Sequence, residues 1–577
     1  MKQSVTRILA LLLALVMLLT GCGTARKAQS EQSETLAPIP VSAQKQKCTD
    51  LGTPLADARV RQALAHAIDM DTVLEALFCG YGEKAGDFDG VLEPAAYDPQ
   101  LSKELLAQAC WPSDYVLDVV YYHDDPQTED FLQVVGSYWD AVGVKAEFRL
   151  LEGDLVSQLW KQPVDGKSAV EWDLAYGAVA ALTDGEVYGR FASHASNNSH
   201  TPEIPGLDAL LEQAAITPDR QKQDALYGQV RDLLAENNAF IPLLHQNCFI
   251  YTSNHLKTTG VTHGNDQFAY DKNILNWTTD REDRILYTDG GPDEFFCYPV
   301  VNPGLYLYQE LLFERLIGAD SDLNPTDGQL AESYALSEDG KTLECVMREE
   351  LFWHDGEPLT AEDVKFTFEL YMKCPGANAV LTEVLKHLEG AQAFLDGDAE
   401  ECTGIAVEEN KVTFRFDEAP ADILTVFSQW PVLPKHCLEA AEPAKLQQDE
   451  FWKNPIGSGP YKVGEIEEGR LCTLERWEDY RETGEGNIEK IVMRPSGETD
   501  GNLVALAQRD LLDYAWGKST DDAVCMGQVE GMHVTEVEIP YTRCFFVNQF
   551  DHESFIAKRE AEPPTEAPSE APTEPTE

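Results

Sequence analysis

The stretch AESYALSEDGKTLECVMREELFWHDGEPLTAEDVKFTFELY, residues 331–371, decides the fold of this chain. Residues 343–347 are predicted to form a strand, and the turn around Asp355 and Gly356 follows it. Thr360 is placed as the N-cap of a helix over residues 364–372, and Asp363, three positions on, imitates a capping box. The stretch therefore predicts a strand, a turn and a helix in direct succession.

Two structured blocks surround and include this stretch, at about residues 50–279 and 284–551. Alternation of strands and helices predicts an α/β fold, with a largely parallel sheet in the first block. In that block, strands are predicted at 115–122, 145–151, 172–180, 240–244 and 249–252, and helices at 59–77, 129–142, 204–215 and 220–236. In the second block, a strand is predicted at 284–288, a helix at 305–316 and a hairpin at 405–416.

Several motifs resemble one family, the family 5 extracellular solute-binding proteins, which include dipeptide-, oligopeptide- and nickel-binding components of ABC importers. Residues 331–371 are similar to the signature of the family's first half, and NPIGSGPY (454–461) resembles its Gly-Thr-Gly-Pro-Tyr loop. DARVRQALAHAID (57–69) looks like a helix of the family's second half. The resemblance implies a two-lobed, type II periplasmic-binding-protein-like α/β fold.

The order of the motifs departs from the family pattern. In the family, a strand ending in a Phe-Asn stretch leads into the helix that 57–69 resembles; here FFVN (545–548) stands at the end of the chain. This order predicts halves in circularly permuted sequence, with both new ends at one crossover and a single covalent hinge left near 243–251. The alternative is two halves fused in the wrong order that do not pair with each other.

The N-terminus predicts export and lipid anchoring. Lys2 and Arg7 precede an apolar run over residues 8–19 that is too short to span a bilayer stably. LTGC (19–22) resembles a bacterial lipobox, which implies lipidation of Cys22 after cleavage. The alternative is an ordinary signal peptide with a chance cysteine.

The predicted organisation has five parts. They are a lipoprotein signal peptide (1–22), a flexible tether (23–48), a second-half lobe (49–245), a first-half lobe with the returning C-terminal segment (246–551) and a disordered Pro/Thr/Glu-rich tail (552–577).

Composition excludes some partners. Lys and Arg number 44 against 100 Asp and Glu, for a formal net charge of −56, which repels nucleic acid and anionic lipid. Apart from Cys22, twelve cysteines are scattered without a CxxC pair or a zinc-type Cys/His spacing, so no metal site is predicted. Many of them are expected to be small buried thiols.

The resemblance implies a ligand site in a cleft between the lobes. The family's peptide binders use an aspartate in the loop that corresponds to residues 178–185; Leu182 takes that position here, and Asp184 lies two residues further on. An alternative role for Asp184 is to cap its own turn. The predicted ligand-binding residues are Tyr176, Leu182, Thr183, Asp184, Phe295, Phe296, Trp430 and Trp516, although core packing is the competing role for each aromatic ring.

The expected function is that of a lipid-anchored solute-binding component of an ABC importer, on the extracytoplasmic face of the cell membrane. Its expected partners are a peptide or similar small solute, ABC permease subunits and the membrane through the lipid anchor, and the protein is expected to be a monomer. No cofactor and no catalytic residue are predicted, since no GxSxG or HExxH motif is present. The alternatives are a sensor or adhesion lipoprotein that keeps the binding fold, or a secreted enzyme.

Overall fold

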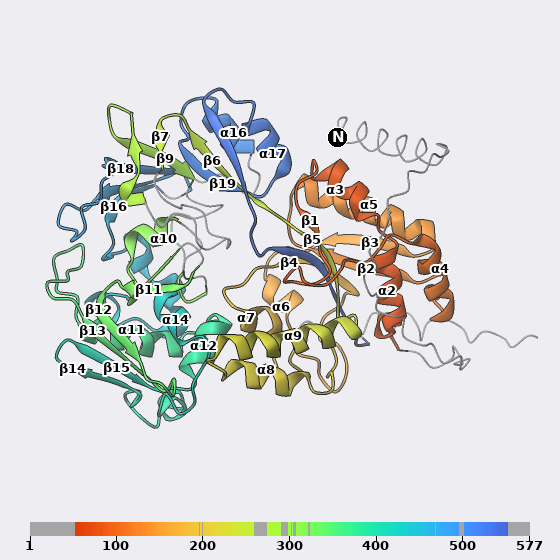
Figure 1. The fold of residues 1–577 in the computed structure, drawn as a ribbon, viewed down its shortest axis with the longest axis horizontal. Coiled ribbons are helices and arrows are strands. Elements are labelled where there is room, and N and C mark those ends of the chain that lie inside the picture. Colours follow the sequence, from red (N-terminus) through yellow and green to blue (C-terminus); the bar gives the residue numbers. More distant parts are fainter. Residues whose placement is uncertain are drawn as a thin grey trace, which may run out of the picture. The chain divides into compact units, whose positions relative to one another are not determined.

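A mixed sheet of six strands is built from both ends of the described chain (Figure 1). In order across the sheet, its strands are β1 (Glu83–Lys84), β5 (Phe240–His245), β21 (Thr542–Val547), β4 (Leu174–Val179), β2 (Val116–Tyr121) and β3 (Lys145–Leu150). β2 pairs in parallel with β3 and β4, whereas β21 pairs antiparallel with β4 and β5. The expectation of a largely parallel sheet is therefore wrong, because β21 and β5 run against their neighbours.

The structure is a computed structural model that describes residues 52–195, 197–198, 200–258, 274–289, 298–301, 303, 307–320, 323–467, 469–494 and 501–551. The predicted signal peptide, tether and tail lie outside these residues, as do Cys22, Phe295 and Phe296.

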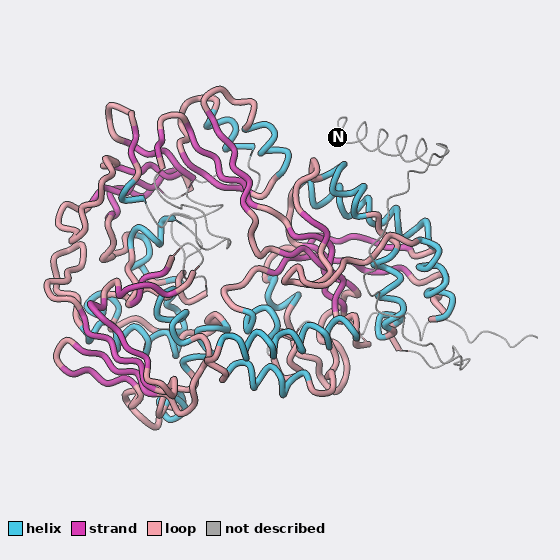
Figure 2. The backbone as a smooth tube through the Cα atoms, viewed as in Figure 1, coloured by secondary structure: helices cyan, strands magenta, loops and turns pink. Residues whose placement is uncertain are grey.

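Helices cover both faces of the six-stranded sheet. They are α2 (Ala58–His66), α3 (Met70–Leu77), α4 (Pro99–Gln108), α5 (Pro126–Val142), α6 (Leu155–Leu159), α7 (Asp184–Gly189), α8 (Leu207–Ala215) and α9 (Arg220–Glu236). Phe545 and Val547 of β21 point into one core, and Cys544 and Phe546 point into the other. A strand buried on both faces is apolar at successive positions, which explains the CFFV run. α8 and α9 lie side by side (Figure 2).

The helix predicted over 59–77 is two helices, α2 and α3. Asp57 caps α2, since its carboxylate accepts a hydrogen bond from the Arg59 amide at 2.9 Å. A second cap, Asp69, starts α3 by accepting hydrogen bonds from the Thr72 amide and hydroxyl. Two capping aspartates in one apolar pattern therefore mark two helices.

A second sheet has seven strands among the described residues. Its order is β16 (Tyr461–Glu467), β17 (Leu471–Arg476), β18 (Lys490–Arg494), β9 (Ile285–Asp289), β19 (Tyr514–Gly517), β6 (Cys248–Ser253) and β20 (Met532–Val537). α16 (Gly501–Ala507) and α17 (Thr520–Met526) pack beside it, and β7 (Leu256–Lys257) pairs with β8 (Thr278–Thr279). β6, from the first block, lies between β19 and β20 of the second.

A third sheet, with four strands among the described residues, carries the signature stretch. Its order is β12 (Ala331–Leu336), β13 (Thr342–Met347), β15 (Lys411–Arg415) and β14 (Ile405–Glu408). Around it lie α10 (Leu307–Leu312), the pair β10 (Ile317–Ala319) and β11 (Pro325–Gly328), α11 (Ala361–Lys373), α12 (Ala379–Leu385), α13 (Ala391–Leu395), α14 (Ile423–Gln429) and α15 (Lys435–Leu438). The hairpin predicted at 405–416 is confirmed as β14 and β15.

The capping box predicted for α11 is also confirmed. The Asp363 carboxylate accepts hydrogen bonds from the Thr360 amide at 2.8 Å and from the Thr360 hydroxyl at 3.0 Å. Its other oxygen accepts from the Lys435 amide at 3.0 Å, so the same side chain fixes α15 against α11.

Two crossover segments join the six-stranded and seven-stranded sheets within the described chain. The first is Gln246 and Asn247, between β5 and β6, and the second is residues 538–541, between β20 and β21. The Gln246 amide donates to the Tyr541 carbonyl at 2.9 Å, so the two segments lie against each other. The expectation of a single covalent hinge is therefore wrong: β21 follows the second crossover, which leaves both segments continuous.

The two ends of the described chain meet on the six-stranded sheet. The Thr53 amide donates to the Asp551 carboxylate at 2.6 Å, and the Asp551 carbonyl accepts from the Ser168 amide at 2.8 Å. Strands from both blocks therefore share two sheets, which contradicts the alternative of halves that do not pair.

The joint between the two blocks, at residues 280–284, is fixed by an ion-pair cluster. Arg281 donates to Asp513 at 2.9 Å and to Asp510 at 2.6 Å. Asp513 is fully buried and also accepts from the Ser253 hydroxyl at 2.6 Å and the Tyr287 amide at 3.0 Å. These bonds hold the joint against β6 and β9.

Candidate functional site

The loop that follows β4 contains three of the predicted ligand residues, Leu182, Thr183 and Asp184. Hydrogen bonds to neighbouring side chains fix its conformation. Thr183 is the N-cap of α7 and accepts a hydrogen bond from the Glu186 amide. The Glu186 carboxylate turns back to accept from the Leu182 amide at 2.9 Å. Its other oxygen accepts from the Asn378 side chain, at the start of α12, at 2.7 Å. Glu186 thus links this loop to the helices around the four-stranded sheet.

Asp422, the residue before α14, approaches the same loop. Its carboxylate accepts a hydrogen bond from the Thr183 side chain. A Cβ added at Gly185 would lie 3.1 Å from the Tyr227 hydroxyl oxygen and 3.6 Å from an Asp422 carboxylate oxygen. A side chain at position 185 would therefore require the Tyr227 hydroxyl to shift by a few tenths of an ångström.

Two carboxyl groups at this contact hold protons more tightly than usual. Burial raises the pKa of Asp184 to about 6, with a further contribution from the negative charge of Asp89. Burial also raises the pKa of Asp422 to about 6, while the Thr183 hydrogen bond and the Arg220 charge act against it. α7 and α14 therefore meet through an acidic contact, in which the Asp184 carboxyl group lies near those of Asp89 and Asp422.

Two of the predicted aromatic residues lie inside cores. Tyr176, on β4, is 2% exposed and packs between the rings of Phe131 and Phe545, at centroid distances of 5.1 and 5.5 Å. Trp430, at the end of α14, is fully buried in the core around the four-stranded sheet. Both rings support the surrounding elements from within.

Trp516 belongs to a group of residues at the crossovers, which we name the crossover cluster: Tyr176, Gln246, Trp516, Lys518, Tyr541 and Arg543. The Lys518 ammonium lies 4.9 Å from the Trp516 ring and 4.3 Å from the Tyr541 ring. Arg543 lies over the rings of Tyr541 and Tyr176, at 5.1 and 5.7 Å. Cations over aromatic faces are stabilised by the ring quadrupoles. The cluster brings together two predicted residues, Tyr176 and Trp516, that lie on different sheets.

Arg543 was not among the predicted site residues. Its signal in the sequence is a single arginine inside an otherwise apolar strand, in the run TRCFFV over residues 542–547. A charged side chain at a position buried on both faces is unusual unless it has a specific partner. That contrast could have identified Arg543 before the structure.

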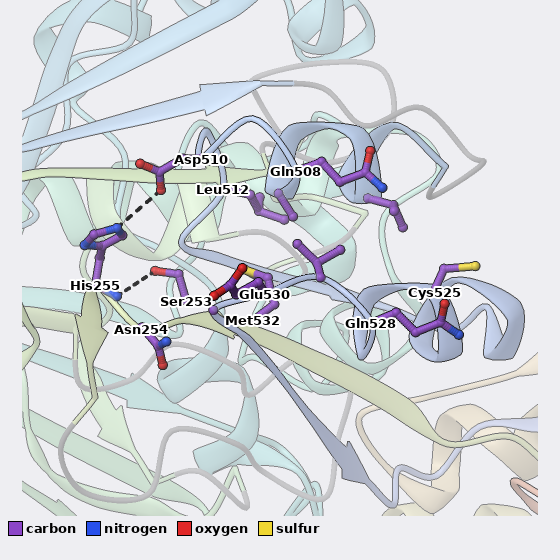
Figure 3. A pocket seen from close by; sticks show the side chains of 14 residues that line it. Ser253, Asn254, His255, Gln508, Asp510, Leu512, Cys525, Gln528, Glu530 and Met532 are labelled. Carbon is purple, nitrogen blue, oxygen red and sulfur yellow. Dashed lines mark hydrogen bonds and ion pairs between the residues drawn. The ribbon is translucent and has the colours of Figure 1, made fainter.

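A cavity of about 820 Å³ lies elsewhere, beside α16 and α17 (Figure 3). Its lining includes Asn254, His255, Gln508, Asp510 and Gln528, and none of the six described predicted residues is among its lining residues. His255 pairs with Asp510 at 3.4 Å at one end of it. This cavity therefore does not coincide with the loop after β4 or with the crossover cluster.

One group of side chains in the described part of the chain has metal-ligand chemistry. Asp355, His436 and Cys437 bring ligand atoms within 4.8 Å of one another at an exposed surface. His436 bonds to Asp355 through its Nε2 at 2.9 Å. The sequence did not suggest this group, because Asp355 and His436 lie far apart in the chain.

Comparison with known proteins identifies the class of protein. The model of the bacterial extracellular solute-binding proteins, family 5 middle, matches residues 37–188 and 326–554, which is more than half of the chain. The fold is accordingly of the two-lobed, type II periplasmic-binding-protein class, and proteins of this class bind solutes rather than transform them. The chain belongs to the family 5 bacterial extracellular solute-binding proteins.

Individual relatives are more distant and are matched over parts of their length. A putative ABC transporter peptide-binding protein of Brucella ovis is 26% identical over 214 residues, which cover 37% of this chain and 38% of the relative. The oligopeptide-binding protein AppA of Bacillus subtilis is 30% identical over 207 residues, 35% of each chain. The chain thus matches well under half the length of these relatives.

Solved structures give similarly partial matches. The Bacillus subtilis AppA structure in complex with a nonapeptide covers 43% of this chain and 46% of that one, at 22% identity and a TM-score of 0.34. The structure of NikZ from Campylobacter jejuni in complex with Ni(L-His) covers 41% of this chain and 43% of that one, at 21% identity and a TM-score of 0.31.

No helix in the described ranges has the length and apolar character needed to cross a membrane.

Proposed function

We propose that this protein is the extracytoplasmic, solute-binding component of an ABC importer and that it captures a peptide or a similar small solute. The observation that carries the proposal is the family match on both parts of the chain. The relatives named as peptide-binding proteins support the ligand class.

The solute is proposed to bind between the six-stranded sheet and the other two sheets, beside the loop after β4 and the crossover cluster. Thr183, Asp184 and Trp516 would face it, with Leu182 shaping the loop. Tyr176 and Trp430 would support this surface from the cores that contain them. Phe295 and Phe296 remain predicted ligand residues.

Membrane attachment is proposed to occur through Cys22, because LTGC (19–22) ends an apolar run preceded by positive charge. Metabolic labelling with a fatty acid, followed by membrane fractionation, tests this. The native chain should carry the label, and the Cys22→Ser variant should lose it. A labelled Cys22→Ser chain would contradict the assignment.

The halves of the fold are proposed to stand in permuted order. The reversed order of the family motifs supports this, as does the 2.6 Å contact between Thr53 and Asp551. A family chain of ordinary order would run from β21 directly into the segment that precedes α2. Adjacent ends make such a rearrangement compatible with an unchanged fold.

A thermal-shift screen tests the central proposal. The panel contains peptides, amino-acid derivatives, nickel chelates and oligosaccharides. A ligand present at 100 times its Kd should stabilise the protein by about 2.7 kcal/mol, which is a clear rise in Tm. If no member of the panel raises the Tm, solute capture is contradicted.

A further inference from the structure

Three side chains with different donor atoms meet on the part of the fold that carries the signature stretch. They are Asp355, in the turn after β13, and His436 and Cys437, on α15. A carboxylate oxygen, an imidazole nitrogen and the thiol sulfur lie within 4.8 Å of one another. The side chains of His436 and Asp355 are 34% and 33% exposed, so an ion in solution can reach them. We name these three residues the Asp-His-Cys group.

The turn that carries Asp355 is held by its own hydrogen bonds. The Trp353 amide donates to the Glu357 carbonyl at 2.9 Å, which closes the turn. The Glu357 amide donates to Oδ1 of Asp355 at 3.1 Å. This bond orients the carboxylate so that its other oxygen, Oδ2, is directed toward His436.

The other two residues of the group are held against the same region. The amide of Lys435, the first residue of α15, donates to the Asp363 carboxylate at 3.0 Å. The His436 ring lies 6.3 Å from the ring of Trp353, which is fully buried. Both sides of the group are therefore positioned by contacts that do not involve its donor atoms, and such positioning lowers the cost of binding an ion.

A surface ion pair accounts for only two of the three side chains. Nε2 of His436 lies 2.9 Å from Oδ2 of Asp355, and exposed pairs of this kind contribute little to stability. Such a pair has no use for a thiol. Cysteines are usually buried, as Cys345 and Cys472 are, whereas Cys437 is exposed beside a carboxylate and an imidazole. The thiol therefore distinguishes this group from an ordinary ion pair.

The three donor types together match Zn²⁺. Zinc binds thiolate sulfur at about 2.3 Å, and imidazole nitrogen and carboxylate oxygen at about 2.0–2.2 Å, in tetrahedral geometry. Bonds of these lengths place neighbouring ligand atoms about 3.3–3.7 Å apart. The separations in the group, 2.9 Å between His436 and Asp355 and at most 4.8 Å overall, reach this range by small side-chain rotations. Mg²⁺ and Ca²⁺ prefer oxygen ligands, so they fit this group less well.

We propose that Asp355, His436 and Cys437 bind one Zn²⁺ ion, with water as the fourth ligand. Binding releases the thiol proton of Cys437 to solvent and replaces the hydrogen bond between His436 and Asp355. The ion would cross-link the turn after β13 to α15 and stabilise this part of the fold. The site goes beyond the proposed function, because none of its residues belongs to the loop after β4 or to the crossover cluster.

The test uses the full chain, reduced and freed of metal. Zn²⁺ is titrated by calorimetry, and Co²⁺ by absorption spectroscopy, because a thiolate bound to Co²⁺ gives a charge-transfer band that carboxylates do not give. Cys437→Ser, His436→Gln and Asp355→Asn each remove one ligand. Cys525→Ser is the matched control, since Cys525 is also an exposed cysteine but lies on α17.

The native chain and Cys525→Ser should bind one equivalent of Zn²⁺ and show the charge-transfer band with Co²⁺. Each ligand variant should weaken Zn²⁺ binding at least about tenfold, because even the loss of an indirect partner of a metal ligand costs about 10–100-fold. Cys437→Ser should also lose the band. Zn²⁺ should raise the Tm of the native chain and leave that of Cys437→Ser unchanged.

Two results would overturn the zinc site. One is weak binding of many equivalents that is equal in all variants, which is the behaviour of an acidic surface with a net charge of −56. The other is a native chain that gives no charge-transfer band with Co²⁺. Cys437→Ser changes one exposed atom and keeps the test decisive if Asp355→Asn fails to fold. Solute binding should be the same with and without Zn²⁺, so its failure concerns the proposed function alone.

Discussion

Two aspartates with a raised pKa make the contact between α7 and α14 sensitive to pH. The pKa values of Asp184 and Asp422 are raised to about 6 in the folded protein, from the ordinary value of 3.8. Between these values the folded state binds more protons than the unfolded state, so stability falls as pH rises from about 4 to about 6. Each carboxyl group should therefore stabilise the contact more at pH 5 than at pH 7.

Asp422→Asn is expected to flatten this dependence. At pH 7 the variant should be more stable than the native chain by about 1–2 kcal/mol, and at pH 4 the difference should be small. Urea unfolding at several pH values measures it, with Asp140→Asn at an exposed position as the control. A native-minus-variant difference that does not change with pH would contradict the assignment.

Arg61, within the motif at 57–69, ties α2 to the end of α9. It is 4% exposed and donates to the carbonyls of Asn237 at 2.6 Å and Asn238 at 2.7 Å, at the C-terminal end of α9. Arg61→Met leaves these acceptors without their partner and should cost about 2–4 kcal/mol in the free energy of unfolding.

Urea denaturation compares Arg61→Met with Arg59→Met, two positions away in the same motif. Arg59 is partly exposed and pairs with Asp57, so its loss should cost about 1 kcal/mol or less. Equal losses for the two variants would show that the carbonyl contacts of Arg61 contribute little.

Features that depend on residues close together in the chain could be predicted from the sequence, whereas features that depend on contacts between distant residues could not. Thr360 and Asp363 are three residues apart, so their capping box could be predicted from spacing alone. The burial of Trp430 and the acids facing Asp184 depend on elements that are distant in the chain. Arg543 was missed for the same reason, since its neighbours come from other strands.

At the scale of elements, Asp363 joins the start of α11 to α15. Asp363→Ala removes the acceptor for Thr360 and for the Lys435 amide, and should lower the free energy of unfolding by about 1–2 kcal/mol. Glu362→Ala is the matched control, because Glu362 is exposed and does not take part in the cap. Similar losses in both variants, measured by urea unfolding, would contradict the role given to the cap.

Most strands and helices could be predicted from hydrophobic periodicity, as β2, β3, α9 and the hairpin of β14 and β15 show. Their arrangement could not. The insertion of β21 between β4 and β5 makes the six-stranded sheet mixed, and no local pattern encodes that partner choice. The break between α2 and α3 was missed because the apolar spacing continues through Asp69.

At the scale of the whole molecule, the proposed permutation predicts that the chain can be opened elsewhere. A variant that starts at Asp283, ends at Glu282 and joins Asp551 to Gly52 by a short linker should fold and keep the same solute preference. The opening lies in an exposed turn, and the joined ends are already in contact.

Circular dichroism and the thermal-shift panel measure this outcome. The same joined chain opened between Val119 and Val120, inside β2, is the control and should not fold. An insoluble or unfolded variant with the opening at residues 282 and 283 would contradict the permuted arrangement.

The motif order predicted a single covalent hinge, and this expectation is wrong because the described chain continues for one more strand, β21, after the second crossover. The chain passes its second crossover before β21, so its ends fall on the six-stranded sheet and both crossovers stay intact. The position of β21 after the second crossover follows from strand pairing, which the order of the motifs does not encode.

The meeting of Thr53 and Asp551 has a mechanical consequence. If Cys22 carries the proposed lipid, a pulling force from the membrane reaches the described chain at Gly52, where Thr53 contacts Asp551 beside the six-stranded sheet. The proposed anchor would then load the six-stranded sheet directly and the seven-stranded sheet only through the two crossover segments.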